Sequence, residues 1–371
     1  LFFIGCGPGD PGVPRDGGGQ RPPYFRAREH EAEYAGPGRE APPLEDVAEV
    51  KIGWFGPDDP AHPLAGQMWQ AAMMAVEEAN AGGGYQGRPF RLRPAWSESP
   101  WGSGIRDLTR LVYEEGIWAV VGAPDGPSAH LVEQVVAKAR RPFISPVSTD
   151  KSVNLVNVPW MFSLAPSDDV LAGSLAEAIA DGLVIVSGTD HDSRVFTEEL
   201  MRALRRHGGF PGQRLELTPG AEDFAESLKE LSESHAAAVA LIARPQDAAC
   251  FLVAMRQAGI LAPIFGGPTM GHHAFGEAAG EYADGATFPL LWYPSDDARA
   301  RDFAARFQTR FGVDPEDGMP QGSERCSETN VHAMRPGAIV GAGIEEKEAR
   351  VPFLARIPGC GNPAKVSVEE Q

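Results

Sequence analysis

The segment Val50-Lys51-Ile52-Gly53-Trp54-Phe55 decides how the chain folds, together with the periodic segment that follows it. Short runs of β-branched and aromatic residues favour a buried β-strand. Between residues 64 and 80 apolar side chains recur every four positions, which predicts a helix, and a run of glycine ends it. These apolar residues are Leu64, Met68, Ala72 and Val76. With a second strand expected at 90–96, the segment predicts the βαβ unit of a parallel sheet.

The alternation of strand and helix continues along the chain in two series. In the first we expect further strands at 118–121 and 142–145 and helices at 105–112 and 128–139. In the second, the expected strands are 183–187, 214–217, 237–243, 263–266 and 286–292. Its expected helices are 168–180, 196–204, 224–231, 247–259 and 303–311. Two such series predict an α/β protein of two doubly wound, Rossmann-like lobes with parallel sheets.

Composition and charge exclude several classes of protein. The chain has 371 residues, with 33 Lys and Arg against 51 Asp and Glu, and a net charge of −18. A nucleic-acid-binding surface or a basic patch on anionic lipid needs the opposite charge. No run in the sequence approaches the roughly 20 apolar residues of a membrane-spanning helix. The four cysteines are too few for a disulfide-rich scaffold.

The first residues, Leu1-Phe2-Phe3-Ile4-Gly5-Cys6, form an apolar run that ends in a small residue and a cysteine. The pattern is similar to the end of a bacterial secretory signal with a lipobox, in which the Cys6 thiol is lipidated. A stray apolar end is the alternative. Residues 7–49 are rich in Gly and Pro with little apolar periodicity, so we expect a flexible tether. We therefore expect a location in the cell envelope, with the membrane contacted only through a lipid anchor.

A set of short motifs in fixed order resembles one known family. The motifs are Lys51–Pro57, Glu77–Gly83, Val120–Gly122, Pro142–Thr149 and Ile264–Gly267. In this order and spacing they resemble the type I periplasmic solute-binding proteins of the branched-chain amino-acid receptor branch. The resemblance implies two lobes joined by three crossovers, which close on a small solute in a cleft and deliver it to an ABC importer.

The resemblance also implies the boundaries of the lobes. Residues 50–163 together with 289–345 would form lobe 1, and residues 164–288 would form lobe 2. After about Gly312 the family continues with an Ala- and Tyr-rich helix that is not recognisable here. The tail at 346–371 is therefore left unassigned.

Ligands of doubly wound sheets bind where strands end and helices begin, and two loops of the first lobe lie at such positions. In the loop at 122–128, Asp125, Gly126 and Ser128 offer amides and a hydroxyl for a carboxylate or amide oxygen. A plain helix cap by Ser128 is the alternative, and the family's serine lies nearer Gly126.

The second of these loops follows the strand at 142–145. By resemblance, Val147 offers its backbone and Thr149 its amide and hydroxyl, with Ser148 between them. Serine and threonine are also ordinary turn residues, so a purely structural role stays open.

In the second lobe, the loop after the strand at 183–187 should face the solute. Its candidate contacts are Asp192, Arg194 and Phe196, since the family often stacks an aromatic residue on the ligand here. Asp192 could equally cap the following helix. His191 between two aspartates suggests a metal ion, but a metal needs three or four converging ligands. No other side chain is expected to converge on His191, so no metal is expected.

The charge of the solute depends on residues that follow the later strands. By resemblance, the acid that binds the ammonium of an amino acid falls near Pro268 or Thr269, and neither is an anion. Arg194 and Arg244 favour an anionic or amide solute instead.

Three further residues could determine which solute binds. Asp125 or Asp192 could replace the missing acid, which keeps an amino acid possible. Trp101, in the loop after the second strand, could cap the apolar part of the solute or be an ordinary surface aromatic residue.

The resemblance implies a monomeric extracytoplasmic binding protein for an amino acid, amide or organic acid, without a cofactor or nucleic acid. Its partners would be the permease subunits of an ABC transporter. A sensing receptor not coupled to transport shares the fold and stays open. An envelope enzyme is less well supported, because the chain has no Gly-x-Ser-x-Gly elbow and Ser128 and His130 face apart on a helix. Gly271-His272-His273 reads as a loop without a catalytic partner.

The cysteines suggest two different states. Cys326 and Cys360 could form a disulfide in an oxidising compartment. Cys250 lies in an expected helix and is predicted to be a buried free thiol.

Overall fold

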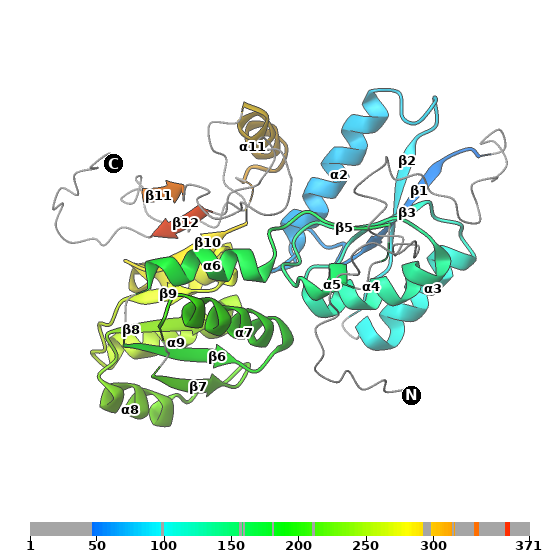
Figure 1. Ribbon diagram of the computed structural model, residues 1–371. Coiled ribbons are helices and arrows are strands. Elements are labelled where there is room, and N and C mark those ends of the chain that lie inside the picture. The colour runs from blue at the N-terminus through cyan, green and yellow to red at the C-terminus, as the bar shows by residue number, and fades with distance from the viewer. Residues whose placement is uncertain are drawn as a thin grey trace, which may run out of the picture. The chain divides into compact units, whose positions relative to one another are not determined.

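The computed structural model describes residues 47–97, 100–155, 158, 160–179, 182–209, 212–291, 298–313, 315, 330–333 and 353–356. These residues form two α/β lobes, each built on its own sheet (Figure 1). The predicted fold class, two doubly wound lobes with parallel sheets, is confirmed. Cys6, most of the expected tether, Cys326 and Cys360 lie outside the described residues.

Five parallel strands form the sheet of the first lobe: β1 (Val50–Phe55), β2 (Phe90–Pro94), β3 (Ala119–Gly122), β4 (Phe143–Ser145) and β5 (Met161–Ser163). Their order is β2-β1-β3-β4-β5, a doubly wound arrangement. The helices between them are α2 (Gly66–Ala81), α3 (Ile105–Tyr113), α4 (Gly126–Ala139) and the short α5 (Ser152–Leu155), with a π-helical turn η2 (Pro100–Gly104) before α3.

The second lobe repeats this order. Its parallel strands are β6 (Leu183–Gly188), β7 (Gln213–Leu217), β8 (Ala238–Ile242), β9 (Ile264–Gly266) and β10 (Thr287–Leu290), arranged β7-β6-β8-β9-β10. Two antiparallel strands extend the sheet beyond β10: β12 (Phe353–Arg356) and then β11 (Asn330–Ala333). The helices are α6 (Asp168–Ala178), α7 (His191–Arg206), α8 (Ala225–Ser234), α9 (Pro245–Gln257) and α10 (His273–Ala279), with 3₁₀ turns η3 (Pro268–Gly271) and η4 (Gly280–Ala283).

Successive side chains of a strand point to opposite faces of the sheet, so each sheet has a separate core on each face. In β6, Leu183 and Ile185 pack with residues of α6 and α7, whereas Val184 and Val186 pack with residues of α8 and α9. A strand that is buried on both faces reads as a continuous apolar run, which is why the sequence predicts β6 clearly.

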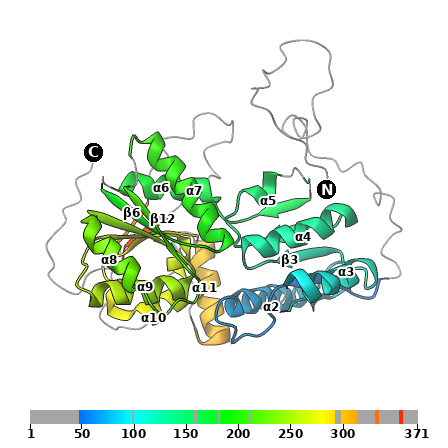
Figure 2. The same cartoon turned by 90° about the horizontal axis from the view of Figure 1, so that it is seen from below.

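The first sheet is covered in the same way. The ring of Trp54 in β1 packs at a tilt against that of Trp69 in α2, with ring centroids 5.5 Å apart. Its neighbour Phe55 joins the core formed with α3 and α4. Figure 2 shows α2 and α4 on opposite faces of this sheet. Among the described residues, no helix combines the length and apolar character needed to cross a bilayer.

The chain passes between the lobes more than once. It enters the second lobe between β5 and α6, and after β10 it returns in α11 (Ala298–Phe311), which packs against α2. It then reaches β11 in the second sheet. The family resemblance implied that 289–345 belong to lobe 1. In the structure β10 pairs with β9 in the second sheet, and β12 then joins β11 to that sheet.

Several local features differ from the sequence prediction. The elements β5, α5, α10, β11 and β12 were not predicted, and His273 begins α10 rather than lying in a loop. Cys250 is a free thiol on α9, as predicted, but it is exposed rather than buried. The buried face of α9 is formed by other residues, among them Phe251, Leu252 and Met255.

Candidate functional site

The loops that leave the carboxyl ends of β3, β4 and β6 contact one another across the two lobes. The Asp192 carboxylate, at the start of α7, accepts from the Gly126 amide, at the start of α4. Nε2 of His191, also at the start of α7, lies 2.8 Å from Oδ2 of Asp150 in the loop after β4. The Asp168 amide, at the start of α6 after β5, donates to the Thr149 carbonyl oxygen at 2.8 Å. The carboxyl ends of strands are where doubly wound sheets bind ligands, so these contacts mark the candidate site.

The turn between β3 and α4 is shaped by a close approach of two strands. Gly122 has φ +126°, and a Cβ there would lie 2.5 Å from the carbonyl oxygen of Phe55. The next amide, that of Ala123, donates to the same oxygen at 2.6 Å. Only glycine fits this backbone, and the turn brings Asp125 to the N-cap of α4.

Protein carboxylates already hold the start of α4. The Asp125 carboxylate accepts from the Ser128 amide at 2.8 Å, and both oxygens of Asp192 lie 3.2 Å from the Gly126 nitrogen. Burial raises the pKa of Asp192 to about 7; repulsion from Asp125 adds to this, and the Gly126 amide opposes it. These are the amides that the sequence analysis expected to bind a carboxylate of the solute.

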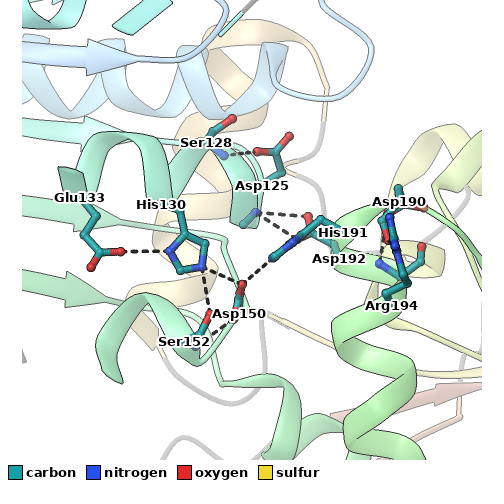
Figure 3. A network of polar contacts seen from close by, with 12 residues as sticks. Asp125, Ser128, His130, Glu133, Asp150, Ser152, Asp190, His191, Asp192 and Arg194 are labelled. Carbon is teal, nitrogen blue, oxygen red and sulfur yellow. Dashed lines mark hydrogen bonds and ion pairs between the residues drawn. The ribbon is translucent and has the colours of Figure 1, made fainter. Parts of the chain in front are cut away.

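A second cluster joins the lobes through Asp150, which follows β4 (Figure 3). Its Oδ2 lies 3.1 Å from Nε2 of His130 on α4 and 2.8 Å from Nε2 of His191 on α7. The Asp150 side chain is 1% exposed, whereas His191 is 42% exposed. The ligand atoms of the three residues lie within 4.8 Å of one another, which makes them the group that could hold a metal ion.

Further contacts orient this cluster. Oδ1 of Asp150 accepts from the Ser152 hydroxyl and amide at 2.6 and 2.8 Å, and Oε2 of Glu133 lies 3.0 Å from Nδ1 of His130. Burial alone would raise the pKa of Asp150, but hydrogen bonds from His130, His191 and Ser152 outweigh it and hold the pKa below its usual range. The hydrogen bond to Asp150 raises the pKa of His130, with Glu133 adding to it and burial opposing it.

The loop after β4 contains a hydroxyl without a partner. Ser148 is 4% exposed, and its Oγ makes no hydrogen bond within the described part of the chain. The neighbouring Thr149 side chain hydrogen-bonds to Asp168. Burial raises the pKa of Asp168 to about 7; the Thr149 hydroxyl opposes this, and the charges of Asp192, Asp150 and Glu199 add to it.

A sequence profile of the family described as "Periplasmic binding protein" matches residues 49–324. The chain belongs to the periplasmic binding protein family. This confirms the family resemblance predicted from the ordered motifs. It is a family of binding proteins rather than enzymes, and membership implies a periplasmic location.

Individual relatives agree with this membership. An "Amino acid binding protein" of Pseudomonas aeruginosa is 27% identical over 224 residues, which are 58% of this chain and 59% of that protein. The match therefore spans less than two thirds of the relative's length.

Solved structures show the same fold. The branched-chain amino acid transporter substrate binding protein LivJ from Streptococcus pneumoniae, in complex with isoleucine, aligns with a TM-score of 0.66 and 19% identity, covering 72% of this chain and 78% of that chain. A leucine binding protein LivK from Thermotoga maritima aligns with a TM-score of 0.64 and 19% identity, covering 72% and 77%.

In this periplasmic binding protein the candidates from the first lobe gather at the site. Asp125, Gly126 and Ser128 begin α4, and Val147, Ser148 and Thr149 follow β4. Ser128 is 2% exposed, and its amide is capped by Asp125 rather than free. Trp101 lies in η2 and is 57% exposed.

Among the candidates from the second lobe, Asp192 meets the first lobe at Gly126, whereas Phe196, Arg194 and Thr269 are placed differently. Phe196 is 2% exposed and packs in the core with Leu200 and Leu204, where it cannot stack on a solute. Arg194 is exposed near Asp190. Thr269 donates its hydroxyl to the Ala243 carbonyl at 2.7 Å.

Arg244 does not supply the unpaired cation that the sequence suggested. Its Nε donates to Asp247 Oδ2 at 2.6 Å, and this hydrogen bond raises the pKa of Arg244. The charge of Asp190 also attracts it. The interval of three residues between Arg244 and Asp247 is a common spacing for an ion pair at a helix start.

Sequence reasoning missed two members of the Asp150 cluster. The expectation that no other side chain would converge on His191 is wrong, because His130 and Asp150 do so. The signals were present: Asp150 directly follows the predicted loop at 145–149, and His130 stands three residues before Glu133 on one helix face.

Asp190 was also missed. Its Oδ1 accepts from the Ser193 amide at 3.0 Å and caps α7. Its Oδ2 is buried and makes no hydrogen bond within the described part of the chain.

Proposed function

We propose that this protein captures an amino acid between its two lobes and delivers it to the permease subunits of an ABC importer. The observation that carries the proposal is the meeting of the loops after β3, β4 and β6, at the carboxyl ends of the strands where doubly wound sheets bind ligands. Two similar proteins, an amino acid binding protein and a substrate binding protein solved in complex with isoleucine, support this class of solute.

The charges around the start of α7 favour a solute with an ammonium group. Asp125, Asp190 and Asp192 gather there, and Asp190 Oδ2 is a buried acceptor without a partner in the described chain. Arg244 is neutralised by Asp247. An ammonium that donates to Asp190 would satisfy this oxygen, and a charged hydrogen bond contributes about 1.5–3 kcal/mol.

The opposite end of the solute would meet the loop after β4. The buried Ser148 hydroxyl has no partner in the described chain, and leaving such a group unsatisfied costs about 1–3 kcal/mol. A carboxylate or carbonyl oxygen of the solute would accept from it, with the backbone of Val147 and Thr149 beside it. This orientation leaves the α4 amides to the carboxylates of Asp125 and Asp192.

We also propose that the mature protein is anchored through lipid on Cys6 and acts as a monomer. The apolar run before Cys6 and the Gly- and Pro-rich segment behind it support the anchor. A tethered body could reach permease subunits in the same membrane.

A thermal-shift panel tests the class of solute. The panel contains the branched-chain and polar amino acids, their amides, and matched organic acids that lack the amino group. We expect the largest increase in melting temperature with a free amino acid, since a ligand at 100 times its dissociation constant stabilises by about 2.7 kcal/mol. Shifts with organic acids alone would contradict an ammonium-binding site, and the absence of any shift would contradict amino-acid capture. Uptake of the labelled solute by vesicles that contain the permease tests delivery.

A further inference from the structure

We propose that His130, Asp150 and His191 form a binding site for a divalent transition-metal ion of the zinc class that links the two lobes. The three donors come from α4, the loop after β4 and the start of α7 (Figure 3). The site does not depend on which solute the protein binds.

The spacing of the donors fits a metal site. In tetrahedral zinc sites the bonds to nitrogen and oxygen are about 2.0–2.2 Å, which places neighbouring donor atoms about 3.3 Å apart. Asp150 Oδ2 lies 3.1 Å from Nε2 of His130 and 2.8 Å from Nε2 of His191. Small adjustments would bring all three atoms to bonding distance of one ion.

The hydrogen bonds around His130 leave its Nε2 facing two acceptors. Glu133 is a carboxylate, so Nδ1 of His130 carries the proton of that hydrogen bond. Nε2 faces Asp150 Oδ2 and, at 2.9 Å, the hydroxyl of Ser152, which already donates to Asp150 Oδ1. An Nε2 between two acceptors needs either a second proton or a cation, and a metal ion would serve both histidines at once.

The surroundings of the donors match those of metal ligands. A carboxylate that accepts from the second nitrogen of a ligating histidine fixes its orientation and increases its basicity, which is the role of Glu133 here. Ser152 holds the other oxygen of Asp150 and points Oδ2 at the histidines. The half-exposed His191 leaves a path for the ion to enter.

The donor set selects the class of ion. Two imidazole nitrogens and one carboxylate oxygen suit zinc and its neighbours, whereas Mg²⁺ and Ca²⁺ prefer sites made of oxygen. Three protein ligands leave a fourth position for water or a group of the solute. Because His191 lies on the second lobe and the other two donors on the first, a bound ion would hold the lobes in contact.

Zinc titration of the tag-free, chelator-treated full chain tests the site, in competition with a chromogenic chelator. We expect one zinc ion per chain, with at least a tenfold loss of affinity in His130→Gln, Asp150→Asn and His191→Gln. Glu133→Gln should weaken binding by about tenfold, since it only positions His130. The control is His207→Gln, an exposed histidine at the other end of α7, which should bind zinc like the wild type.

Two readouts distinguish this site from adventitious zinc. Cobalt(II) in place of zinc should give the strong visible absorption of a four- or five-coordinate ion, and His191→Gln should abolish it. His191→Gln should fold normally, judged by circular dichroism, since the side chain is half-exposed. The absence of saturable zinc binding, or wild-type zinc affinity in all three ligand variants, would overturn the proposal. Solute binding by the metal-free protein is measured separately, so either proposal can fail without the other.

Discussion

The carboxylate of Asp192 lies 3.2 Å from the backbone nitrogen of Gly126, so a side chain of the second lobe holds the start of a helix in the first. The positive end of a helix dipole favours an anion, and here the Asp192 carboxyl, whose pKa is raised to about 7, occupies that position. A solute carboxylate would have to displace Asp192 to reach the same amide. The contact therefore favours a solute that presents its ammonium to this region.

The role of Asp190 can be tested by removing its charge. Asparagine also caps helices well, so Asp190→Asn should keep the hydrogen bond to the Ser193 amide while losing the ammonium partner. We expect affinity for the amino acid to fall by about 1.5–3 kcal/mol in calorimetry, with little change in melting temperature. The control is Asp223→Asn, because the exposed Asp223 also accepts from a backbone amide at the start of a helix, that of Ala225 in α8. Equal losses in the two variants would remove Asp190 from the site.

Substitution of Ser148 should affect solute affinity without lowering the stability of the fold. Because its buried hydroxyl has no partner in the described chain, Ser148→Ala should leave the melting temperature unchanged or slightly higher. If the solute is the missing partner, affinity should fall by about 1–3 kcal/mol. Ser145→Ala is the matched control, since Ser145 is also buried with an unpartnered hydroxyl but lies within β4. Wild-type affinity in Ser148→Ala would show that this hydroxyl does not touch the solute.

Asp168 should make stability depend on pH. Its pKa is raised by burial to about 7 in the folded state, whereas a free aspartate has about 3.9. The folded state therefore holds a proton that the unfolded state releases, so this residue lowers stability as pH rises from about 4 to 7. Asp168→Asn keeps an oxygen for Thr149 and should remove this decrease, gaining on the order of 4 kcal/mol at pH 8.

Melting curves at pH 5 and pH 8 measure this effect. Asp169→Asn, in the same first turn of α6 but hydrogen-bonded to Ser167, is the control. If Asp168→Asn and the wild type lose stability equally between the two pH values, Asp168 is not the group responsible.

Gly122 tests the turn that places Asp125. An added Cβ at Gly122 would meet the Phe55 carbonyl oxygen at 2.5 Å, whereas one at Gly116, φ +67°, meets nothing within 4 Å. Gly116→Ala should cost about 1–2 kcal/mol for its left-handed backbone alone. Gly122→Ala should cost at least twice as much in urea unfolding, because the strands must also separate. Similar losses of stability in the two variants would mean that the close approach of Gly122 to the Phe55 carbonyl is not important.

Lipidation predicts where the protein is found in the cell. Cys6→Ser in the full-length gene should release the protein from the membrane fraction into the periplasmic extract, because the thiol that carries the lipid is gone. Cys250→Ser is the control, since Cys250 lies on α9. Membrane fractionation with immunodetection measures the difference, and an unchanged distribution would contradict the lipid anchor.

The fold could be predicted from the sequence because its signals are local. The strand at 50–55 was located to the residue, and the apolar run at 183–187 corresponds to β6 within one residue. The short β5 was missed because three residues of mixed exposure carry no periodicity. The position of β12 beside β10 depends on a pairing between segments more than sixty residues apart, which no local pattern reveals.

The candidate site was harder to predict, because it depends on side-chain contacts between distant segments. The loops were found from the rule that ligands bind at strand ends. The direction of each side chain was not: Phe196 shares a helix face with Leu200 and Leu204, and that face is the core of the lobe. The cluster around Asp150 joins residues 20 and 41 positions away, and only the folded chain brings them together.

The packing of α11 against α2 has a consequence for synthesis of the protein. Arg310 pairs with Glu77 at 2.9 Å and Arg306 with Glu78, across more than 220 residues of chain. At about 5–20 residues per second, a ribosome needs roughly 10–50 s to make the intervening chain. During that time α2 lacks its partner, although the strands around it are complete. The first lobe is thus begun first but lacks α11 until strands β6 to β10 of the second lobe have been made. A chaperone that shields the uncovered face of α2 would act in this interval.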